Sequence, residues 1–160
     1  MPQAHSYWRA DRPAEGFYTT ELPADPAALT VRTFLPDGYE PRYPYPLLVL
    51  FHPHASNEDQ VLKLAPKMSH RNFVAISFRG PQTVGEAGDG LPACGWDGMA
   101  PDQIADDVVR AVEQTRRTYH VHSERIYLVG VQEGAEPAYR AAFALGDKVA
   151  GVAALNGAVP

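Results

Sequence analysis

The chain has 160 residues, of which 45% are hydrophobic and 21% charged, and this fits one folded domain with a core of its own. Its formal net charge of -5 excludes the basic surface that nucleic acids and anionic membranes attract, and no apolar run approaches the length of a membrane span. Cys94 is the only cysteine, which excludes an internal disulfide. We expect a cytoplasmic protein that needs no cofactor.

The first segments predict a lead-in followed by a pair of strands. Residues 1–16 have no apolar core and are expected to form a flexible lead-in, so that the domain covers residues 17–160. Two extended stretches, 17–22 and 30–35, flank a turn that contains proline and aspartate, which predicts an antiparallel pair. The proline-rich segment 36–46 is then a connector that cannot form a helix.

Buried strands and a broken helix follow the connector. Continuous apolar runs at 47–51 and 73–78 indicate strands that are covered on both faces. Between these runs, a helix is predicted from about Glu58, and Pro66 interrupts it.

A loop and the clearest helix of the chain come next. Residues 79–101 are rich in glycine and proline and predict a long loop. The helix after it is predicted from about Pro101 to Tyr119, with apolar residues at helical spacing. Acidic residues in its first turns, and Arg116 and Arg117 in its last, match the helix dipole.

The last third of the chain completes an α/β pattern. Strands are predicted at 125–130 and 149–155, with a helix from about Gly134 to Leu145 between them. Strands that alternate with helices predict a mostly parallel sheet with helices on both faces. In such a sheet, chemistry takes place beyond the carboxyl ends of the strands.

The stretch LVGVQEGAEP, residues 128–137, has the outline of a nucleophile elbow, Gly-x-Ser-x-Gly, in which a sharp turn from strand to helix presents the attacking hydroxyl. Its middle position holds Gln132, flanked by Gly130 and Gly134. A carboxamide has no ionisable hydroxyl or thiol, so Gln132 cannot form the usual acyl-enzyme. The sequence therefore predicts an elbow without its nucleophile, at a strain of about 1 to 3 kcal/mol for a non-glycine residue.

Two stretches of the sequence resemble α/β-hydrolases, and specifically the carboxylesterase, phospholipase and polyhydroxyalkanoate-depolymerase-like esterases. The stretch LPDGYEPRYPYPLLVLFHPHASNEDQV is similar to the family's proline-rich connector, buried strand and His-Gly-x-Gly loop. The stretch ERIYLVGVQEGAEPAYRAA is similar to its strand, elbow and following helix. The resemblance covers roughly residues 17–160 and implies an α/β-hydrolase core.

The resemblance also implies an oxyanion hole built from the backbone N–H groups of His54 and Glu133. Pro53 stands where the family's His-Gly-x-Gly loop has its first glycine, and Ala55 stands where it has the second. Because proline has no amide proton and a fixed φ, we expect the geometry of this loop to be altered.

The acid and the histidine of a catalytic triad are expected after the elbow in this family, but all six histidines of the chain precede it. The sequence ends at Pro160, soon after strand 149–155, so we expect the fold's C-terminal strands to be missing. Strand 149–155 is then an open edge of the sheet. We interpret the chain as a fragment or a truncated copy.

Four other side chains near these motifs have a functional or a structural interpretation. His52 and His54, with Glu58 nearby, form a metal half-site, or His52 is simply a hydrogen-bonded anchor of the loop. Trp96 lies in the loop that should overhang the site, where it lines an apolar pocket or packs the loop. Cys94 is interpreted as an ordinary loop cysteine.

These features lead to three functional hypotheses. The first is an esterase-like but catalytically inactive protein that binds a small ester or acyl ligand beside Gln132. The second is an active hydrolase of carboxylic esters or thioesters that uses an unrecognised nucleophile or a water bound to a metal at His52 and His54. The third is a structural or interaction subunit that forms a homo-oligomer through the open edge of strand 149–155.

Overall fold

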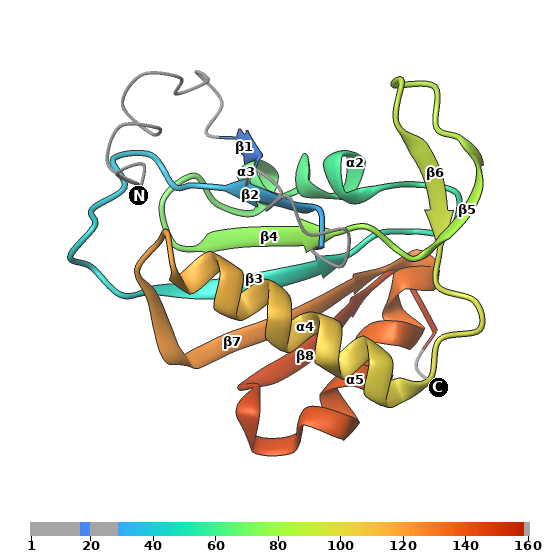
Figure 1. The fold of residues 1–160 in the computed structure, drawn as a ribbon. Helices are drawn as coiled ribbons and strands as arrows, with labels where there is room; N and C mark the ends of the chain where they lie inside the picture. Colours follow the sequence, from blue (N-terminus) through green and yellow to red (C-terminus); the bar gives the residue numbers. More distant parts are fainter. Residues whose placement is uncertain (1–16, 20–28, 159–160) are drawn as a thin grey trace.

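The computed structural model describes residues 17–19 and 29–158 (Figure 1). The predicted lead-in, residues 1–16, lies outside the described residues. Six strands form one sheet in the order β1-β2-β4-β3-β7-β8, and two further strands, β5 and β6, form a separate hairpin.

The central strands of the large sheet are parallel, as predicted, and an antiparallel pair extends it on one side. Strands β4, β3, β7 and β8 run in the same direction, whereas β2 is antiparallel to β4 and to β1. The bounds are Phe17–Thr19 for β1, Val31–Phe34 for β2, Tyr45–Phe51 for β3, Val74–Phe78 for β4, Val121–Val131 for β7 and Gly151–Leu155 for β8.

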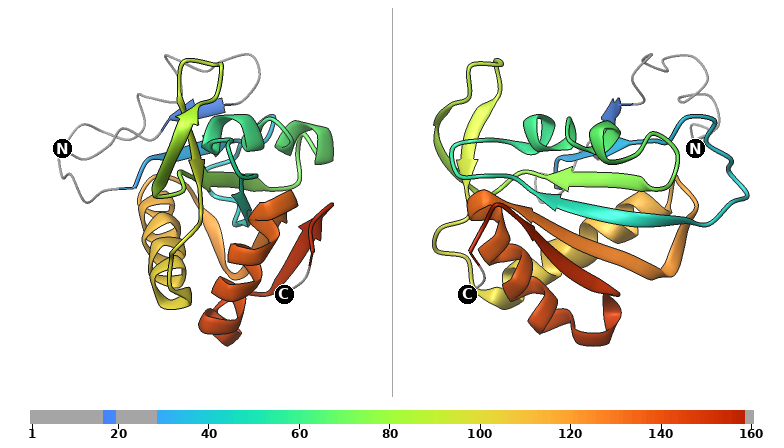
Figure 2. Two further views of the ribbon diagram at one scale, coloured as in Figure 1. Left: turned by 90° about the vertical axis from the view of Figure 1, so that its right-hand side faces the viewer. Right: turned by 180° about the vertical axis from the view of Figure 1, so that it is seen from behind.

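Helices cover both faces of this sheet, which gives three layers (Figure 2). Helices α4 (Pro101–Arg116) and α5 (Ala135–Leu145) pack on one face. The short helices α2 (Glu58–Leu62) and α3 (Ala65–Met68) pack on the other face, over β2, β3 and β4. No helix of the described residues is both long enough and apolar enough to cross a membrane.

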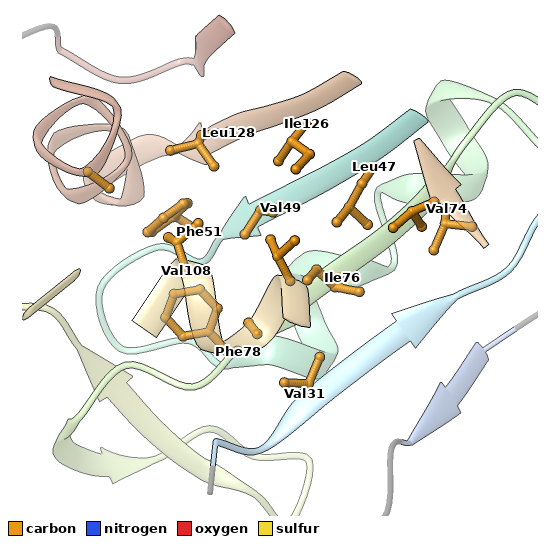
Figure 3. Packing of buried hydrophobic residues seen from close by; sticks show 14 of the residues in the cluster. Val31, Leu47, Val49, Phe51, Val74, Ile76, Phe78, Val108, Ile126 and Leu128 are labelled. Carbon is orange, nitrogen blue, oxygen red and sulfur yellow. The ribbon is translucent and has the colours of Figure 1, made fainter. Parts of the chain in front are cut away.

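Strand β3 divides the core because its side chains alternate between the two faces. Val49 and Phe51 point into the larger cluster, against Val108 of α4 (Figure 3). Leu50 points into the smaller cluster, which α2 and α3 cover. All three strand residues are fully buried, so the continuous apolar run at 47–51 reflects a strand with two covered faces.

Local sequence explains the break between α2 and α3. The Asn57 side chain caps α2 and accepts hydrogen bonds from the backbone N–H groups of Asp59 and Gln60. Pro66 lies in the first turn of α3, where the missing amide costs no helical hydrogen bond. The predicted interruption of the helix is confirmed, although the break falls at residues 63–64 and Pro66 lies in the second helix.

The segment 79–101 differs from its prediction as a loop, because it contains the hairpin of β5 (Gln82–Glu86) and β6 (Pro92–Gly95). Gly88 and Gly90 adopt positive φ angles in the tip, so the glycines that predicted a loop instead close a hairpin. The hairpin projects from the body of the molecule beside the ends of β3 and β4 (Figure 1).

Hydrogen bonds from the loop after β3 and from α2 hold this hairpin in place. Asn57 donates to the Asp89 carboxylate and to the carbonyl of Pro92, while Gln60 donates to the carbonyl of Ala87. The backbone N–H of Cys94 donates to the carbonyl of Ser56 at 2.7 Å. Polar residues of the loop and of α2 therefore fix the position of the hairpin.

Candidate functional site

The parallel strands bring four segments to one edge of the sheet. The loop 52–57 follows β3, the hairpin follows β4, the elbow follows β7, and residues 156–158 follow β8. These strand ends meet on the side of the molecule from which the hairpin projects (Figure 1). The edge is the place where a fold of this type carries its chemistry.

The elbow has the predicted shape. Strand β7 ends at Val131, a single 3₁₀ turn covers Gln132–Gly134, and α5 begins at Ala135. Gln132 has a φ of 52°, in the left-handed region, and its side chain is exposed. A glutamine therefore occupies the strained apex of the turn.

Small residues form a frame around this apex. A methyl group on Gly130 would overlap the backbone of Gly134 and Ala135, and one on Gly134 would overlap the carbonyl oxygen of Phe51. A methyl group on Gly157, after β8, would overlap the carbonyl oxygen of Gln132. The turn is thus held between the end of β3 and the segment that follows β8.

The loop after β3 keeps a left-handed residue at the position of the family's second glycine. Ala55 has a φ of 58°, and the backbone N–H of Ser56 donates to the carbonyl of Pro53 at 3.2 Å. This turn leaves the side chain of His54 exposed at the cavity described below. Proline at position 53 therefore does not prevent a tight turn in this loop.

His52 is an anchor of the loop. Its ring Nδ1 lies 2.8 Å from the carbonyl oxygen of Pro53, and its Nε2 accepts a hydrogen bond of 2.9 Å from the backbone N–H of Gly80. The ring is fully buried, and burial lowers the pKa of His52 below its ordinary value. With both nitrogens engaged, His52 has no lone pair left for a metal, so the half-site of His52 and His54 is not formed.

Glu58, considered above for the same half-site, is committed to another partner. Its carboxylate, with 3% of the side chain exposed, accepts bonds of 3.1 and 2.6 Å from Arg79, which follows β4. These hydrogen bonds raise the pKa of Arg79. No group of three or more histidine, cysteine or acidic side chains in the described part of the chain is arranged to hold a metal.

Trp96 connects the hairpin to the site. Its Nε1–H donates to the carbonyl of His52 at 2.9 Å, and its ring packs against those of His52, Phe51 and Phe78. Only 8% of the residue is exposed, and this part lines a cavity. Trp96 therefore both packs the segment and forms part of a pocket wall. Cys94, predicted in a loop, lies instead in β6, where burial raises the pKa of its thiol.

Two adjoining cavities flank the elbow. The first has a volume of about 290 Å³ and lies between the loop after β3, the segment after β6 and the start of α5; its lining residues are His54, Trp96, Asp97, Gly98, Met99, Ile104, Glu133, Glu136, Pro137 and Arg140. The second is more open, with about 590 Å³; its lining residues are Gln132, Glu133, Glu136, Asn156, Gly157 and Ala158. Glu133 and Glu136 separate the two.

Charged side chains concentrate in the first cavity. The Nδ1 atom of His54 lies 3.9 Å from a carboxylate oxygen of Asp97, and Arg140 forms an ion pair with Glu136. Sequence reasoning identified His54 and Glu133 here but missed Asp97, Glu136 and Arg140 as lining residues. The spacing of residues 136 and 140, one helical turn apart, is the only signal that pointed to a pair.

The remaining described histidines lie away from the elbow. The backbone carbonyl of His70 accepts from Asp37 before β4, and His120 contacts Tyr39 and Tyr45 at the start of β3. His122 is at the start of β7. These positions are at the opposite ends of the strands, so none of the three side chains can reach the site.

The fold matches solved structures of hydrolases. An acetyl xylan esterase from Aspergillus awamori aligns with a TM-score of 0.65 at 13% identity, over 85% of this chain and 50% of that one. A dienelactone hydrolase-like promiscuous phosphotriesterase from metagenomic libraries aligns with a TM-score of 0.64 at 11% identity, over 88% and 59%. A thermostable esterase aligns with a TM-score of 0.57 at 17% identity, over 85% and 39%.

The chain has the α/β-hydrolase fold, which it shares with these esterases and dienelactone hydrolase-like proteins. It spans about half the length of the solved structures that it matches. No family model matches the sequence, and no curated protein matches it. Identities this low establish the fold alone, so a function has to be argued from the residues of the site.

Proposed function

We propose that the protein is an esterase-like α/β-hydrolase-fold protein that forms no acyl-enzyme and binds a small ester or acyl ligand beside its elbow. The observation that carries the proposal is the exposed Gln132, at a φ of 52°, where the fold presents its nucleophile. A carboxamide donates and accepts hydrogen bonds but cannot attack a carbonyl as a hydroxyl or thiolate does. The elbow is thus suited to contact a ligand without bonding to it covalently.

The described surroundings of the elbow support the absence of an acyl-enzyme route because they offer no replacement nucleophile. The residues that line the two cavities include no serine, threonine or cysteine. Cys94 is fully buried, and its raised pKa keeps the thiol protonated. The Ser56 hydroxyl is engaged with the Gln60 side chain at 2.8 Å.

The first cavity supports a small ligand with both apolar and polar parts. Its volume of about 290 Å³ is at the lower limit of the range for small-molecule sites. Trp96, Met99 and Ile104 supply apolar surface, while His54 and Glu133 place polar groups in the same cavity. A short acyl chain attached to an ester carbonyl matches this division.

A fluorophosphonate probe tests the absence of an acyl-enzyme route. Such probes react with activated serine and related nucleophiles, so we expect no stoichiometric adduct on the purified chain by intact-protein mass spectrometry. Stoichiometric labelling anywhere in residues 52–57, 94–97 or 130–136 would show an activated nucleophile there and overturn the proposal that no acyl-enzyme forms.

Titration with ethyl butyrate tests ligand binding. The indole N–H of Trp96 donates to the carbonyl of His52 beside the cavity, so its NMR signal should shift as the ester binds. Met99→Gln should weaken binding because Met99 lines the cavity. Met68→Gln is the matched control, since Met68 is exposed on α3 on the other face of the sheet. Equal shifts in both variants, or none in the parent protein, would contradict the proposed site.

A second proposal concerns assembly, and the edge of β8 supports it. Within the described residues β8 pairs only with β7, and its residues Gly151–Leu155 carry no charge that would discourage pairing. Leu155 is 38% exposed and Phe143 on α5 is 79% exposed. We infer that a second copy pairs along this edge. Light scattering after size exclusion tests this, and a monomer at all concentrations would refute it.

A further inference from the structure

His54 differs from the other histidine of its loop in having a free ring nitrogen. Its ring packs over Gly95 with Nδ1 toward Asp97, at 3.9 Å from the carboxylate. Within the described part of the chain, its Nε2 has no hydrogen-bond partner, whereas both nitrogens of His52 are engaged. The side chain of His54 is 45% exposed and lines the cavity in which an ester is proposed to bind.

We infer that His54 is a general base that activates water for slow hydrolysis of an ester held in this cavity, without a nucleophile at position 132. The inference rests on the proposed function for the binding of the ester. A proton on Nδ1, facing Asp97, leaves Nε2 with the lone pair that a base requires. This water route is open to the chain although the acyl-enzyme route is closed.

The reaction has two steps that balance. In the first, water attacks the ester carbonyl carbon, a carbon–oxygen bond forms, and Nε2 of His54 takes the proton of the water. In the second, the tetrahedral intermediate collapses, the bond to the alkoxy oxygen breaks, and the protonated His54 gives its proton to the leaving alcohol. The products are the carboxylic acid and the alcohol, and no bond to the protein forms.

The backbone N–H of Glu133 is placed to hold the oxygen that becomes negative in the intermediate. Glu133 lies in the first turn after the elbow, where backbone amides have no acceptor within the helix. It lines the same cavity as His54. A preorganised amide of this kind stabilises an oxyanion most strongly in the transition state.

Asp97 acts through His54 as a positioning residue. At 3.9 Å the two side chains form an ion pair only when His54 is protonated, and the distance is too long for a hydrogen bond. Asp97 therefore favours the imidazolium of the intermediate more than the neutral ring. Because the Asp97 side chain is 74% exposed, the effect is small, about five-fold in rate.

The experiment measures the hydrolysis of ethyl butyrate in a pH-stat, since an alkyl ester does not react with a surface imidazole in the way that an activated aryl ester does. His54→Ala is expected to lower the rate about 100-fold, a typical contribution of a general base. His70→Ala is the matched control, because His70 also lies 3.9 Å from an aspartate, Asp37, away from the cavity. Its rate should equal that of the parent protein.

The kinetic constants distinguish positioning from a structural role. The charged groups that share the cavity with His54 are Asp97, Glu133, Glu136 and Arg140. Asp97→Asn should lower kcat about five-fold and leave KM unchanged, because Asp97 acts on the protonated ring that forms during the reaction. A purely structural role would change KM as well.

The outcomes separate this inference from the proposed function. Hydrolysis that withstands a fluorophosphonate, leaves no acyl adduct and is lost in His54→Ala supports the water route. Ester binding without hydrolysis, or hydrolysis unchanged in His54→Ala, overturns the inference and leaves the binding site in place. Absence of any ester binding in the parent protein overturns both.

Discussion

Replacing Gln132 with glycine is expected to stabilise the protein, because the elbow holds this residue in a left-handed conformation at a φ of 52°. Glycine adopts such a φ without the clash of a Cβ atom. The side chain of Gln132 is exposed and makes no hydrogen bond with other described residues, so its removal costs little contact energy. The change therefore isolates the strain of the backbone.

The magnitude follows from two opposing terms. A left-handed conformation costs a non-glycine residue about 1 to 2 kcal/mol. The greater freedom of glycine in the unfolded chain costs about 0.4 to 1 kcal/mol in return. We expect a net gain of about 0.5 to 1 kcal/mol in the free energy of unfolding, which for a urea m-value of about 2 kcal/mol/M raises the midpoint by about 0.25 to 0.5 M.

Urea unfolding followed by circular dichroism measures this gain, and Glu133→Gly is the matched control. Glu133 is the next residue, is also exposed and does not have a positive φ. Glycine at this position relieves no strain and only adds the entropy of a freer unfolded chain, so it should destabilise the protein by about 0.5 to 1 kcal/mol. The two variants should move the midpoint in opposite directions. If Gln132→Gly destabilises as much as Glu133→Gly, position 132 carries no strain and the argument from the elbow fails.

Three further predictions concern the supports of the site. Arg79→Met should cost about 3 to 5 kcal/mol of unfolding free energy, more than Glu58→Gln. Methionine leaves the Glu58 carboxylate, with 3% exposure, unpaired, whereas glutamine leaves a guanidinium that is 31% exposed. Urea unfolding of both variants measures the two costs, and the reverse order would refute this prediction. Asn57→Ala should cost about 1 to 2 kcal/mol through the lost cap of α2, and limited proteolysis should show faster cleavage in residues 82–95, which Asn57 also holds. The lowered pKa of His52 means that between this pKa and about pH 6.5 the unfolded chain binds up to one more proton than the folded protein. Stability is therefore complete above about pH 6.5 and falls by up to about 1.4 kcal/mol per unit within that interval. Unfolding between pH 7.5 and 5.5 should show this slope in the parent protein but not in His52→Asn, and equal slopes would contradict the cause.

The elbow could be predicted from the sequence because its signals are local. Gly130 and Gly134 bracket three residues, with Gln132 in the middle, between an apolar strand and a helix, and the fold allows few other arrangements of that pattern. The positive φ of Gln132 follows from the turn itself. Because the pattern lies within five neighbouring residues, 130–134, the local sequence is enough to predict it.

The hairpin of β5 and β6 could not be predicted in the same way. Every residue of β5 is exposed, so its sequence has no alternation of apolar and polar residues to indicate a strand. The hairpin is held instead by Asn57 and Gln60, which lie more than 25 positions earlier. The cavity could not be predicted for the same reason, because Asp97 and Arg140 come from distant segments that only the folded sheet brings together.

The strained backbone lies at the edge of the sheet where the glycine frame surrounds Gln132, the position without a nucleophile. Among the described residues, the non-glycine residues with positive φ are Ala55, Gln132 and Asn156, and they lie in the segments that follow β3, β7 and β8. At about 1 to 2 kcal/mol each, left-handed backbone is a substantial cost for a domain of marginal stability, although asparagine bears it more easily than the other two. None of the three occurs at the opposite edge, where the strands begin. Strain of this kind persists where the surrounding structure over-determines it, and the overlaps at Gly130, Gly134 and Gly157 show that the packing here does so. The backbone of the elbow is therefore fixed by the fold even where the side chain at its apex cannot attack, and the proposed water route through His54 requires this backbone but no nucleophile at position 132.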